Sequence, residues 1–410
     1  MHYNSGDTAW LLISAALVLF MTPGVALFYG GMIRSKNVLS IVMQSLAAMA
    51  IITVLWIVFG FSESFSTSFS SLFGNLNFIG LEHLKTIPGF SHLDVPPLAF
   101  VSFQLMFAII TAALISGATA ERLKFSSFCV FIAVWFVLVY GPIAHWSFSP
   151  EGWLAKRSLL DFAGGTVVEI CSGFSALGLL LAVGPRRNWP KNLARPHSIP
   201  LSAIGAAIIW FGWFGFNAGS GIDANSVAAF AFINTQAAAA AGLIGWVFIE
   251  RIKDSTSTVL GAFSGAVAGM VAITPCAGFV SPIPSLIIGL LAGVGCSMFV
   301  RTKFKFGLDD SLDVLGVHGI GGVIGTVLLG LFAESSVNSI AHNGLFFSGG
   351  LHQLGIQILA TVVCAAYSCL ISYLIGIAIK KTFGLRVDPE VEYQGLDLAM
   401  HGESAYGEDN

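Results

Sequence analysis

The chain has 410 residues, of which 55% are hydrophobic and only 10% are charged, and its mean hydropathy is +0.82. This composition excludes an ordinary soluble domain and predicts an all-α polytopic membrane protein. The formal net charge of −3 gives no indication of a nucleic-acid partner.

Eleven apolar runs are each long enough to cross a bilayer, which predicts eleven transmembrane helices. The first run follows a segment without a basic n-region, so no signal peptide is expected. The last run is long enough to tilt or to protrude. In chain order the predicted spans cover residues 9–32, 38–60, 97–120, 125–145, 161–184, 199–218, 226–249, 257–275, 283–300, 311–333 and 349–379.

The distribution of Lys and Arg predicts an N-out, C-in topology. With the N-terminus outside, the cytoplasmic side receives all of the 19 Lys and Arg residues except Lys85, Lys156 and Arg157. Such a bias is the signature of the positive-inside rule.

The order of the spans predicts a 5+5 inverted repeat followed by one extra helix. Five spans precede the basic loop, so the sixth span starts on the opposite side of the membrane from the first. We therefore expect a first transmembrane half at 1–184, a cytoplasmic linker at 185–198, a second half at 199–333, an extra span at 349–379 and a cytoplasmic C-terminal tail at 380–410.

Two stretches, 161–170 and 310–319, stand at corresponding places in the two halves. Each opens with an Asp that is typical of a helix N-cap, and each carries an ionisable residue eight positions later, Glu169 and His318. Eight helical residues rise about 12 Å. Because the two helices enter from opposite faces, we expect both side chains near the middle of the membrane.

Ionisable residues at that depth are functional by default, because they are costly to bury. The residues alone leave open that Glu169 and His318 are hydrogen-bonded core residues. Asp161 is interpreted first as a helix cap, with a direct role at the pore entrance as the alternative. Asp313 is interpreted as a cytoplasmic-end cap or loop contact.

Several long motifs are distributed over the chain. They are Ala-Leu-Phe-Tyr-Gly-Gly at 26–31, Asp-Phe-Ala-Gly-Gly-Thr at 161–166, Trp-Phe-Gly-Phe-Asn-Ala-Gly-Ser at 213–220, Thr-Pro at 274–275, Gly-Val-His-Gly at 316–319 and Glu-Tyr-Gln-Gly-Leu-Asp at 392–397 in the tail. These motifs resemble the Amt/Mep/Rh ammonium transporter family, and the tail is similar to that of the Amt branch. The resemblance implies a homotrimer with one narrow hydrophobic pore in each subunit, and ammonium or ammonia as substrate, with methylammonium as an analogue.

By this resemblance, individual positions receive roles. Phe107 and Phe216 match the stacked phenylalanines that gate the outer mouth. His318 matches the second member of the histidine pair in the pore. Ser220 matches the hydroxyl of the external ammonium site, Trp213 a pore-lining aromatic residue and Thr274 a vestibule residue.

The sequence departs from the family pattern at two places. Glu169 stands where the first pore histidine is expected, a replacement also seen in some fungal members. Phe148 stands where the family has the tryptophan of the external site, so either Phe148 takes that role or Trp146 supplies the ring. Because Trp is the best cation–π partner, Phe148 predicts weaker ion recruitment.

The chemistry of ammonium fits such a pore. Ammonium resembles potassium in size and charge, but it donates hydrogen bonds and can lose a proton. A hydroxyl and aromatic faces can recognise the hydrogen-bond donors and the charge of ammonium. A dry pore favours the deprotonated form, because neutral ammonia avoids the desolvation cost of an ion. We expect Glu169 and His318 to relay the proton as a coupled pair, which makes transport electrogenic.

Two other functions stay open: an ammonium sensor that signals through a partner, and a neutral-gas channel of the Rh type. An enzyme is not expected, because no nucleophile–base arrangement or phosphate loop is recognisable. The six cysteines have no CxxC spacing and favour buried thiols, so neither a metal nor a cofactor is expected. The resemblance also implies a PII-type signal protein at the cytoplasmic face, in a cell-membrane protein embedded in the lipid bilayer.

Overall fold

The computed structural model describes residues 3–67, 69, 71–90, 93–187, 189–191, 193 and 195–407. Three residues of the predicted linker, 188, 192 and 194, and residues 408–410 of the predicted tail lie outside this part of the chain. Within the described ranges the regular structure is helical, apart from isolated β-bridges such as the one between Leu123 and Arg386. The predicted all-α class is confirmed.

The first half of the chain forms five long helical segments, several of them built from consecutive elements. They are α1 (Ser5–Met32); α2 (Val38–Leu55) continued by η2 (Trp56–Gly60) and α3 (Phe61–Phe65); α4 (Pro97–Ile115) with η4 (Ser116–Thr119); α5 (Phe125–Trp135) continued by η5 (Phe136–Tyr140) and α6 (Gly141–Phe148); and η7 (Gly165–Ile170) with α7 (Cys171–Val183).

The rest of the chain forms six more long segments and a short C-terminal pair. They are α8 (Ile199–Gly219), α9 (Ser226–Asp254), α10 (Val259–Ile273), α11 (Pro282–Thr302) with η8 (Lys303–Phe306), η9 (Leu315–Gly319) with α12 (Ile320–Phe332), α13 (His352–Thr382), α14 (Pro389–Gln394) and α15 (Leu396–His401). Single 3-10 turns are η1 (Ser35–Asn37), η3 (Ile79–Leu81), η6 (Ala155–Arg157) and η10 (Leu345–Phe347).

Ten of these segments in the described chain are long and apolar enough to cross a membrane. The apolar helix α10 has 15 residues and is shorter than a full span. Each predicted span overlaps one of the eleven segments, and the exact number of membrane crossings stays a prediction. Capping side chains explain several helix starts, because Asn4, Asn225 and Thr258 accept hydrogen bonds from backbone N–H groups of the first turns of α1, α9 and α10.

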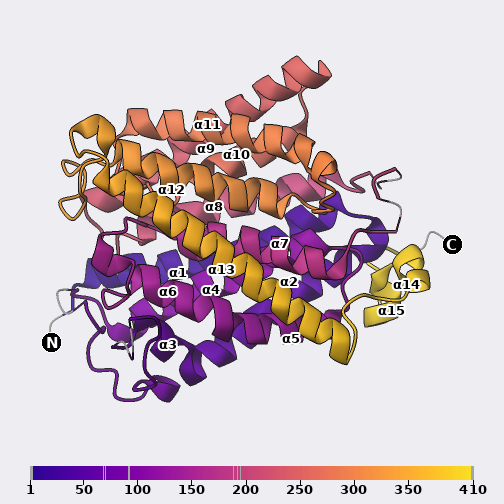
Figure 1. Ribbon diagram of the computed structural model, residues 1–410, viewed down its shortest axis with the longest axis horizontal. Coiled ribbons are helices and arrows are strands. Elements are labelled where there is room, and N and C mark those ends of the chain that lie inside the picture. Colours follow the sequence, from indigo (N-terminus) through magenta and orange to yellow (C-terminus); the bar gives the residue numbers. More distant parts are fainter. Residues whose placement is uncertain are drawn as a thin grey trace.

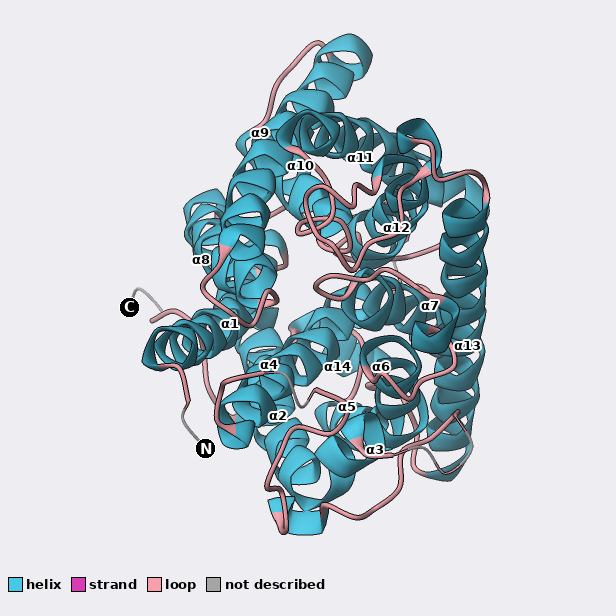
Figure 2. Cartoon of the chain, turned by 90° about the vertical axis from the view of Figure 1, so that its left-hand side faces the viewer, coloured by secondary structure: helices cyan, strands magenta, loops and turns pink. Residues whose placement is uncertain are grey.

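The long helices run side by side along the longest axis of the molecule, with α13 crossing them obliquely (Figure 1). The two ends of the chain lie at opposite ends of this bundle, as an odd number of crossings requires. Viewed from one end, α9, α10 and α11 lie on one side of the bundle, α2, α3 and α5 lie on the other, and α13 forms an edge (Figure 2).

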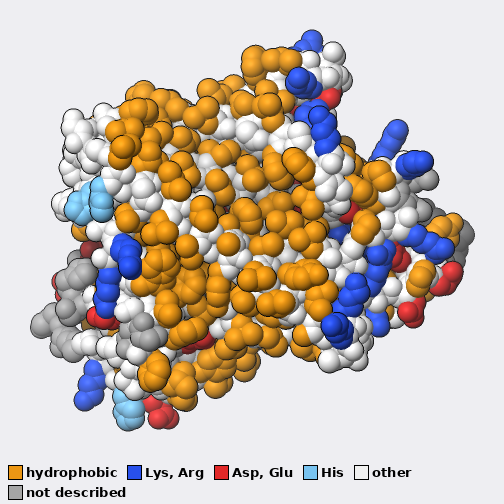
Figure 3. Space-filling view, in the orientation of Figure 1, with side chains coloured by type: hydrophobic (Ala, Val, Ile, Leu, Met, Phe, Trp, Pro, Cys, Tyr) orange, Lys and Arg blue, Asp and Glu red, His pale blue; other side chains and the backbone are white. Residues whose placement is uncertain are grey.

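The visible surface has an apolar belt, and its basic side chains gather near the C-terminal end (Figure 3). An apolar belt of this kind suits lipid contact. The gathering of Lys and Arg at the end that carries the C-terminus agrees with a cytoplasmic C-terminus, and the orientation itself stays a prediction.

The packing of corresponding helices agrees with the expected repeat. Helix α1 packs along α8, which is its counterpart in the second half. Likewise η7 packs against α12 while α7 packs against η9, so the two counterparts make reciprocal contacts. This reciprocity is what a two-fold relation between the halves produces, and it brings the two predicted functional helices together in the centre.

Candidate functional site

The two Asp residues cap the central helices from a distance. Asp161 accepts hydrogen bonds from the backbone N–H groups of Gly164 (2.9 Å), Gly165 (2.6 Å) and Thr166 (2.8 Å), and also from the Thr166 hydroxyl. Asp310 accepts from the N–H groups of Val314 (3.1 Å) and Leu315 (2.8 Å). The expected capping role is therefore present in both halves.

The start of these helices differs from the prediction. Helical structure begins at Gly165 and Leu315, about one turn later than the predicted 161 and 311. In the first case the intervening N–H groups have partners elsewhere, because Phe162 donates to the Pro275 carbonyl and Ala163 to the Thr274 carbonyl. The loop is thus fixed to the end of α10 instead of continuing the helix.

Both helices open with a wide π-helical turn, and the two ionisable residues lie inside these turns. Glu169 belongs to η7 and His318 to η9. Such turns are rare and occur frequently at functional sites, because they shift the direction of a side chain relative to the helix that follows.

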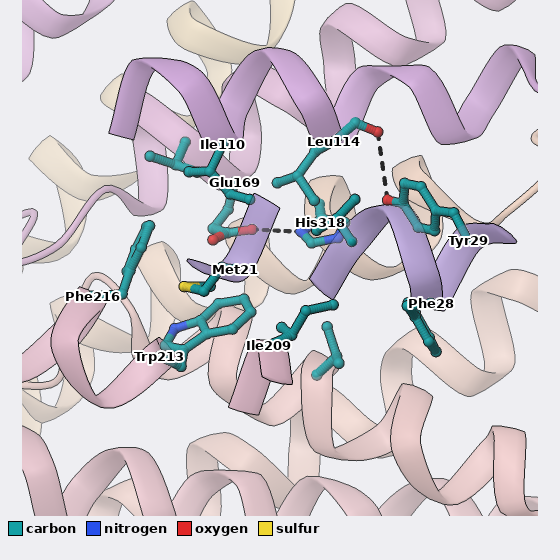
Figure 4. A pocket seen from close by; sticks show the side chains of 13 residues that line it. Met21, Phe28, Tyr29, Ile110, Leu114, Glu169, Ile209, Trp213, Phe216 and His318 are labelled. Atoms are coloured by element: carbon teal, nitrogen blue, oxygen red, sulfur yellow. Dashed lines mark hydrogen bonds and ion pairs between the residues drawn. The ribbon is translucent and has the colours of Figure 1, made fainter. Parts of the chain in front are cut away.

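Glu169 and His318 meet at the centre of the molecule. The Nδ1 atom of His318 lies 2.7 Å from Oε2 of Glu169, and the two residues are 5% and 1% exposed (Figure 4). At this distance the carboxyl and the imidazole are joined by a hydrogen bond. The pair is therefore an acid–base couple held out of bulk water.

Two glycines allow this close approach. A Cβ atom at Gly173 would lie 2.3 Å from the backbone of Gly319, and one at Gly322 would lie 2.9 Å from Cβ of Glu169. A larger residue at Gly173 would separate α7 from η9, and one at Gly322 would separate α12 from η7, since small residues permit close helix contact in membranes.

A narrow, mostly apolar cavity of about 20 Å³ surrounds the pair. This volume holds about one water-sized molecule. Phe216 lies at one end, and Phe28 and Tyr29 lie at the other (Figure 4). The remaining lining residues, besides the pair, are Met21, Val25, Ile110, Leu114, Val168, Ile209, Trp213 and Val267.

A second cavity, of about 560 Å³, lies on the other side of a phenylalanine pair. Phe107 lines this outer cavity and Phe216 lines the narrow one. Their rings stack with centroids 4.4 Å apart and planes 27° apart, so the two rings form the partition. The outer cavity is also lined by Phe148, Ser220 and Asp161.

The Ser220 hydroxyl can accept a hydrogen bond from a ligand in the outer cavity. The Ser220 hydroxyl donates to the Phe216 carbonyl (2.8 Å), which leaves its oxygen lone pairs for a ligand. The Phe148 ring stands edge-on to Phe107, with centroids 6.3 Å apart. A cation there would face aromatic rings and an acceptor oxygen.

Two residues expected at the outer vestibule have other partners. The Trp146 indole donates to the Leu72 carbonyl (2.7 Å) and packs against Trp153 and Tyr367, so Phe148 is the aromatic residue of this pair that lines the cavity. Thr274 is fully buried and accepts the indole N–H of Trp213 (3.0 Å). Thr274 therefore orients the Trp213 ring, which lines the narrow cavity, from the side away from that cavity.

Sequence reasoning assigned no role to several lining residues. Tyr29 and Met21 line the narrow cavity, and the buried amide of Gln104 lines the outer one. Tyr29 belongs to the motif at 26–31, which was the available signal for it. Met21 and Gln104 carry no such signal, because their direction depends on how α1 and α4 are rotated in the bundle.

A third cavity, of about 90 Å³, lies toward the opposite end and contains an ion-pair network. Glu121 accepts from Arg34 (2.9 Å) and Arg186 (3.0 Å), and Arg186 also bridges to Asp309 (2.7 Å). Burial alone would raise the pKa of Glu121, but the two guanidinium groups outweigh it and hold that pKa below its usual range. Asp309 shows the same balance of burial against Arg186 and Arg122, and its pKa is also lowered.

The described part of the chain has no group of three or more His, Cys, Asp or Glu residues that could hold a metal ion. The site therefore consists of an aromatic outer cavity, a phenylalanine partition, a narrow cavity with one acid–base couple, and a polar inner cavity.

Comparisons with known proteins agree on one family. Residues 9–406 match the Ammonium Transporter Family. An ammonium transporter of Mycobacterium tuberculosis is 46% identical, with the alignment covering 98% of this chain and 90% of the relative. The crystal structure of Saccharomyces cerevisiae Mep2 superposes with a TM-score of 0.91 at 32% identity and covers 100% and 93% of the two chains. A structure described as a sensor Amt protein superposes with a TM-score of 0.88 at 30% identity and covers 97% and 98%.

Proposed function

Since this chain belongs to the Ammonium Transporter Family, we propose that it recruits ammonium at the outer cavity and conducts it as ammonia, with Glu169 and His318 relaying the proton. The observation that carries this proposal is the 2.7 Å contact between these two side chains inside an apolar cavity sized for one small molecule. The family is one of transporters and not of enzymes, and the chain is a multi-pass membrane protein.

Recruitment rests on the chemistry of the outer cavity. Ammonium offers four N–H donors and a positive charge. Ser220 offers acceptor lone pairs, while Phe107 and Phe148 offer aromatic faces. The Asp161 carboxylate at the cavity wall adds a favourable field for a cation, although its oxygens are already hydrogen-bonded by the helix N–H groups that it caps.

Selection against potassium follows at the phenylalanine partition. A bare ion that passes Phe107 and Phe216 would lose its hydration and find few polar partners in the narrow cavity. Ammonium avoids this cost by giving up a proton and continuing as ammonia. Trp213, held by Thr274, keeps the wall of the cavity apolar at this point.

The Glu169–His318 couple takes the proton and passes it inward. An imidazole exchanges protons near neutral pH, and a carboxyl that shares a proton with it makes the exchange a property of the pair. The ammonia molecule then leaves past Phe28 and Tyr29 toward the inner cavity. Because nitrogen and proton both cross the membrane, transport is electrogenic.

Electrical recording on purified protein in liposomes tests this function. We expect an ammonium gradient to drive a current, methylammonium to drive a smaller one, and potassium to drive none. Nitrogen flux without current would refute the proton relay and leave the neutral-gas channel of the Rh type. Absence of flux, with the protein intact, would refute transport itself.

A sensor is the second candidate, and the superposition on a structure described as a sensor Amt protein is the observation that favours it. A sensor binds ammonium at the outer cavity and signals through a partner without useful flux. Growth of ammonium-transport-deficient cells that carry this protein separates the two, because a pure sensor does not restore growth on low ammonium.

Assembly and regulation extend the proposal. We infer a homotrimer in the cell membrane and a PII-type signal protein at the cytoplasmic face. The support is the family membership and the ordered tail, in which Arg386 pairs with Glu392 (2.7 Å) and Asp397 accepts from the N–H groups of Leu39 and Ser40 at the start of α2. Mass measurement of the purified complex, alone and with a PII protein, tests both.

A further inference from the structure

Gln357 is a buried amide on α13, the helix that lies outside the inverted repeat. It is 0% exposed, and its side chain has four hydrogen-bond contacts. The Oε1 atom accepts from the Leu160 N–H (3.1 Å) and from the Gln353 amide (3.0 Å). The Nε2 group donates to the carbonyls of Leu160 (2.8 Å) and Thr326 (3.2 Å).

These bonds join three parts of the candidate site. Both backbone polar groups of Leu160 are held by one side chain, and the next residue is Asp161, which lines the outer cavity and caps the helix of Glu169. Thr326 lies on α12, which continues the helix of His318. One amide of α13 is therefore attached to the segments that precede Glu169 and follow His318.

We propose that Gln357 is a positioning residue for transport: it fixes the Leu160–Asp161 segment at the outer cavity and sets the spacing of the helices that carry Glu169 and His318. It touches neither substrate nor the acid–base couple, and it acts through Leu160 and Thr326. This inference rests on the proposed function, since its consequence is a change in ammonium transport.

The pattern of bonds requires an amide. A hydrophobic residue would fill the space, but it would leave the buried N–H and C=O groups of Leu160 without this partner and would remove the additional bond to the Thr326 carbonyl. The amide of a Gln side chain offers an acceptor and two donors in one plane, which matches the N–H and C=O of Leu160. Gln353 adds to the fixation, because it also donates to the Ser158 carbonyl (3.1 Å).

Thr361 provides a matched control on the same helix. It lies one turn further along α13, it is 6% exposed, and its hydroxyl bonds only the Gln357 carbonyl of its own helix (2.8 Å). Thr361→Val therefore removes a buried polar group from α13 without releasing the Leu160 segment.

The experiment measures ammonium-driven current against ammonium concentration, normalised to the amount of folded protein in the liposomes. For Gln357→Met we expect the half-saturating ammonium concentration to rise about tenfold, because a displaced outer site binds the ion less well. We expect the maximal current per folded protein to fall less than the affinity does. Thr361→Val should leave both values within about twofold of the wild type.

Gln357→Glu gives a graded case. Its carboxyl keeps an acceptor for the Leu160 N–H, and in its neutral form it restores one of the two donors. We expect a half-saturating concentration between those of the wild type and Gln357→Met.

Every outcome decides the matter. An unchanged half-saturating concentration in folded Gln357→Met would overturn the proposal. Failure of both Gln357 variants to fold, with Thr361→Val intact, would also overturn it and assign the residue to fold stability alone. A wild-type protein that gives no ammonium current would instead refute the proposed function, so the two failures are distinguishable.

Discussion

At the scale of single residues, Glu169 shows how a carboxyl group is accommodated in the narrow apolar cavity. Its one polar side-chain partner in the described chain is His318, at 2.7 Å, and the cavity around both is almost entirely apolar. A lone charge there would be costly, whereas a pair that shares one proton remains neutral or carries a single charge. The acid–base couple is thus the smallest unit able to accept a proton in that place.

Replacement of Glu169 by Gln tests the couple directly. Gln keeps the size and the hydrogen bond but does not titrate, so we expect ammonium-driven current to fall about 100-fold, as for loss of a proton-transfer group. The measurement is current per folded protein in liposomes. Glu250→Gln is the control. Glu250 is also buried, but it lies near the C-terminal end of α9 and bonds Thr258, the N-cap of α10. The current of the Glu250→Gln variant should stay unchanged.

The outer cavity allows a gain-of-function prediction. Phe148→Trp supplies a larger aromatic face for a cation, and exposed cation–π contacts contribute about 0.5–1 kcal/mol. We expect the half-saturating ammonium concentration to fall about two- to fivefold. An unchanged value would mean that the ring at Phe148 does not face the ion.

Ser220→Ala tests the hydroxyl of the same cavity. Loss of one acceptor to a charged ligand should raise the half-saturating concentration about tenfold, since such a bond contributes about 1.5 kcal/mol. Ser102→Ala is the matched control, because the Ser102 hydroxyl bonds a carbonyl four residues back (2.7 Å), as that of Ser220 does, but Ser102 is not one of the residues that line the cavity. Equal effects in both variants would contradict a ligand role.

At the scale of elements, the central helices depend on backbone contact at glycines. The turns η7 and η9 can bring Glu169 and His318 within 2.7 Å only because Gly173 places no Cβ atom between α7 and η9, and Gly322 places none between α12 and η7. The capping Asp residues then fix where each helix begins. The distance between Glu169 and His318 is therefore set by the packing of the helices that carry them, and not by the two side chains alone.

Gly173→Val should disturb this contact. The new side chain begins 2.3 Å from Gly319, so we expect a destabilisation of at least about 1–3 kcal/mol and a large loss of current, measured by thermal unfolding in detergent and by electrical recording. Gly355→Ala in α13 is the control: no atom lies within 4 Å of its Cβ position, and Ala favours a helix by up to about 1 kcal/mol.

At the scale of the whole molecule, charged groups at the end that carries the C-terminus join the two halves of the chain to the tail. Glu121 joins Arg34 of the first half to Arg186 of the linker, and Arg186 joins Asp309 of the second half. Arg34 also donates to the carbonyls of Glu392 (2.8 Å) and Tyr393 (3.2 Å) in the tail. The tail is therefore connected through Arg34 and Glu121 to ion pairs of both halves.

This network predicts a pH dependence of stability. The pKa of Glu121 is lower in the folded than in the unfolded chain, so its contribution is fully present above the unfolded value, about 4.3, and is lost as the pH falls through the folded value. We expect Glu121→Gln to lower the free energy of unfolding at pH 7 by about 1–3 kcal/mol, which is measured as a lower thermal unfolding midpoint. The difference from the wild type should shrink below about pH 4, and a constant difference would contradict the ion-pair account.

The sequence by itself determined the membrane-spanning helices, the caps at Asp161 and Asp310 and the candidate acid–base couple. These features depend on hydrophobicity and on local spacing along the chain, so they could be read residue by residue. The starts of the two central helices were placed about one turn too early. For the first of them, the reason is that the loop after Asp161 gives its N–H groups to the end of α10, which is distant in sequence.

Only the tertiary structure decided which side chains face a cavity. It showed that Phe148, and not Trp146, lines the outer cavity, and that Thr274 lies behind Trp213. It also placed Tyr29 in the lining of the narrow cavity and Gln104 in that of the outer one. It also showed that Gln357 of the last long helix holds Leu160. The physical reason is that each residue turns a helix by about 100°, so the direction of a side chain is fixed by packing against helices far away in the chain.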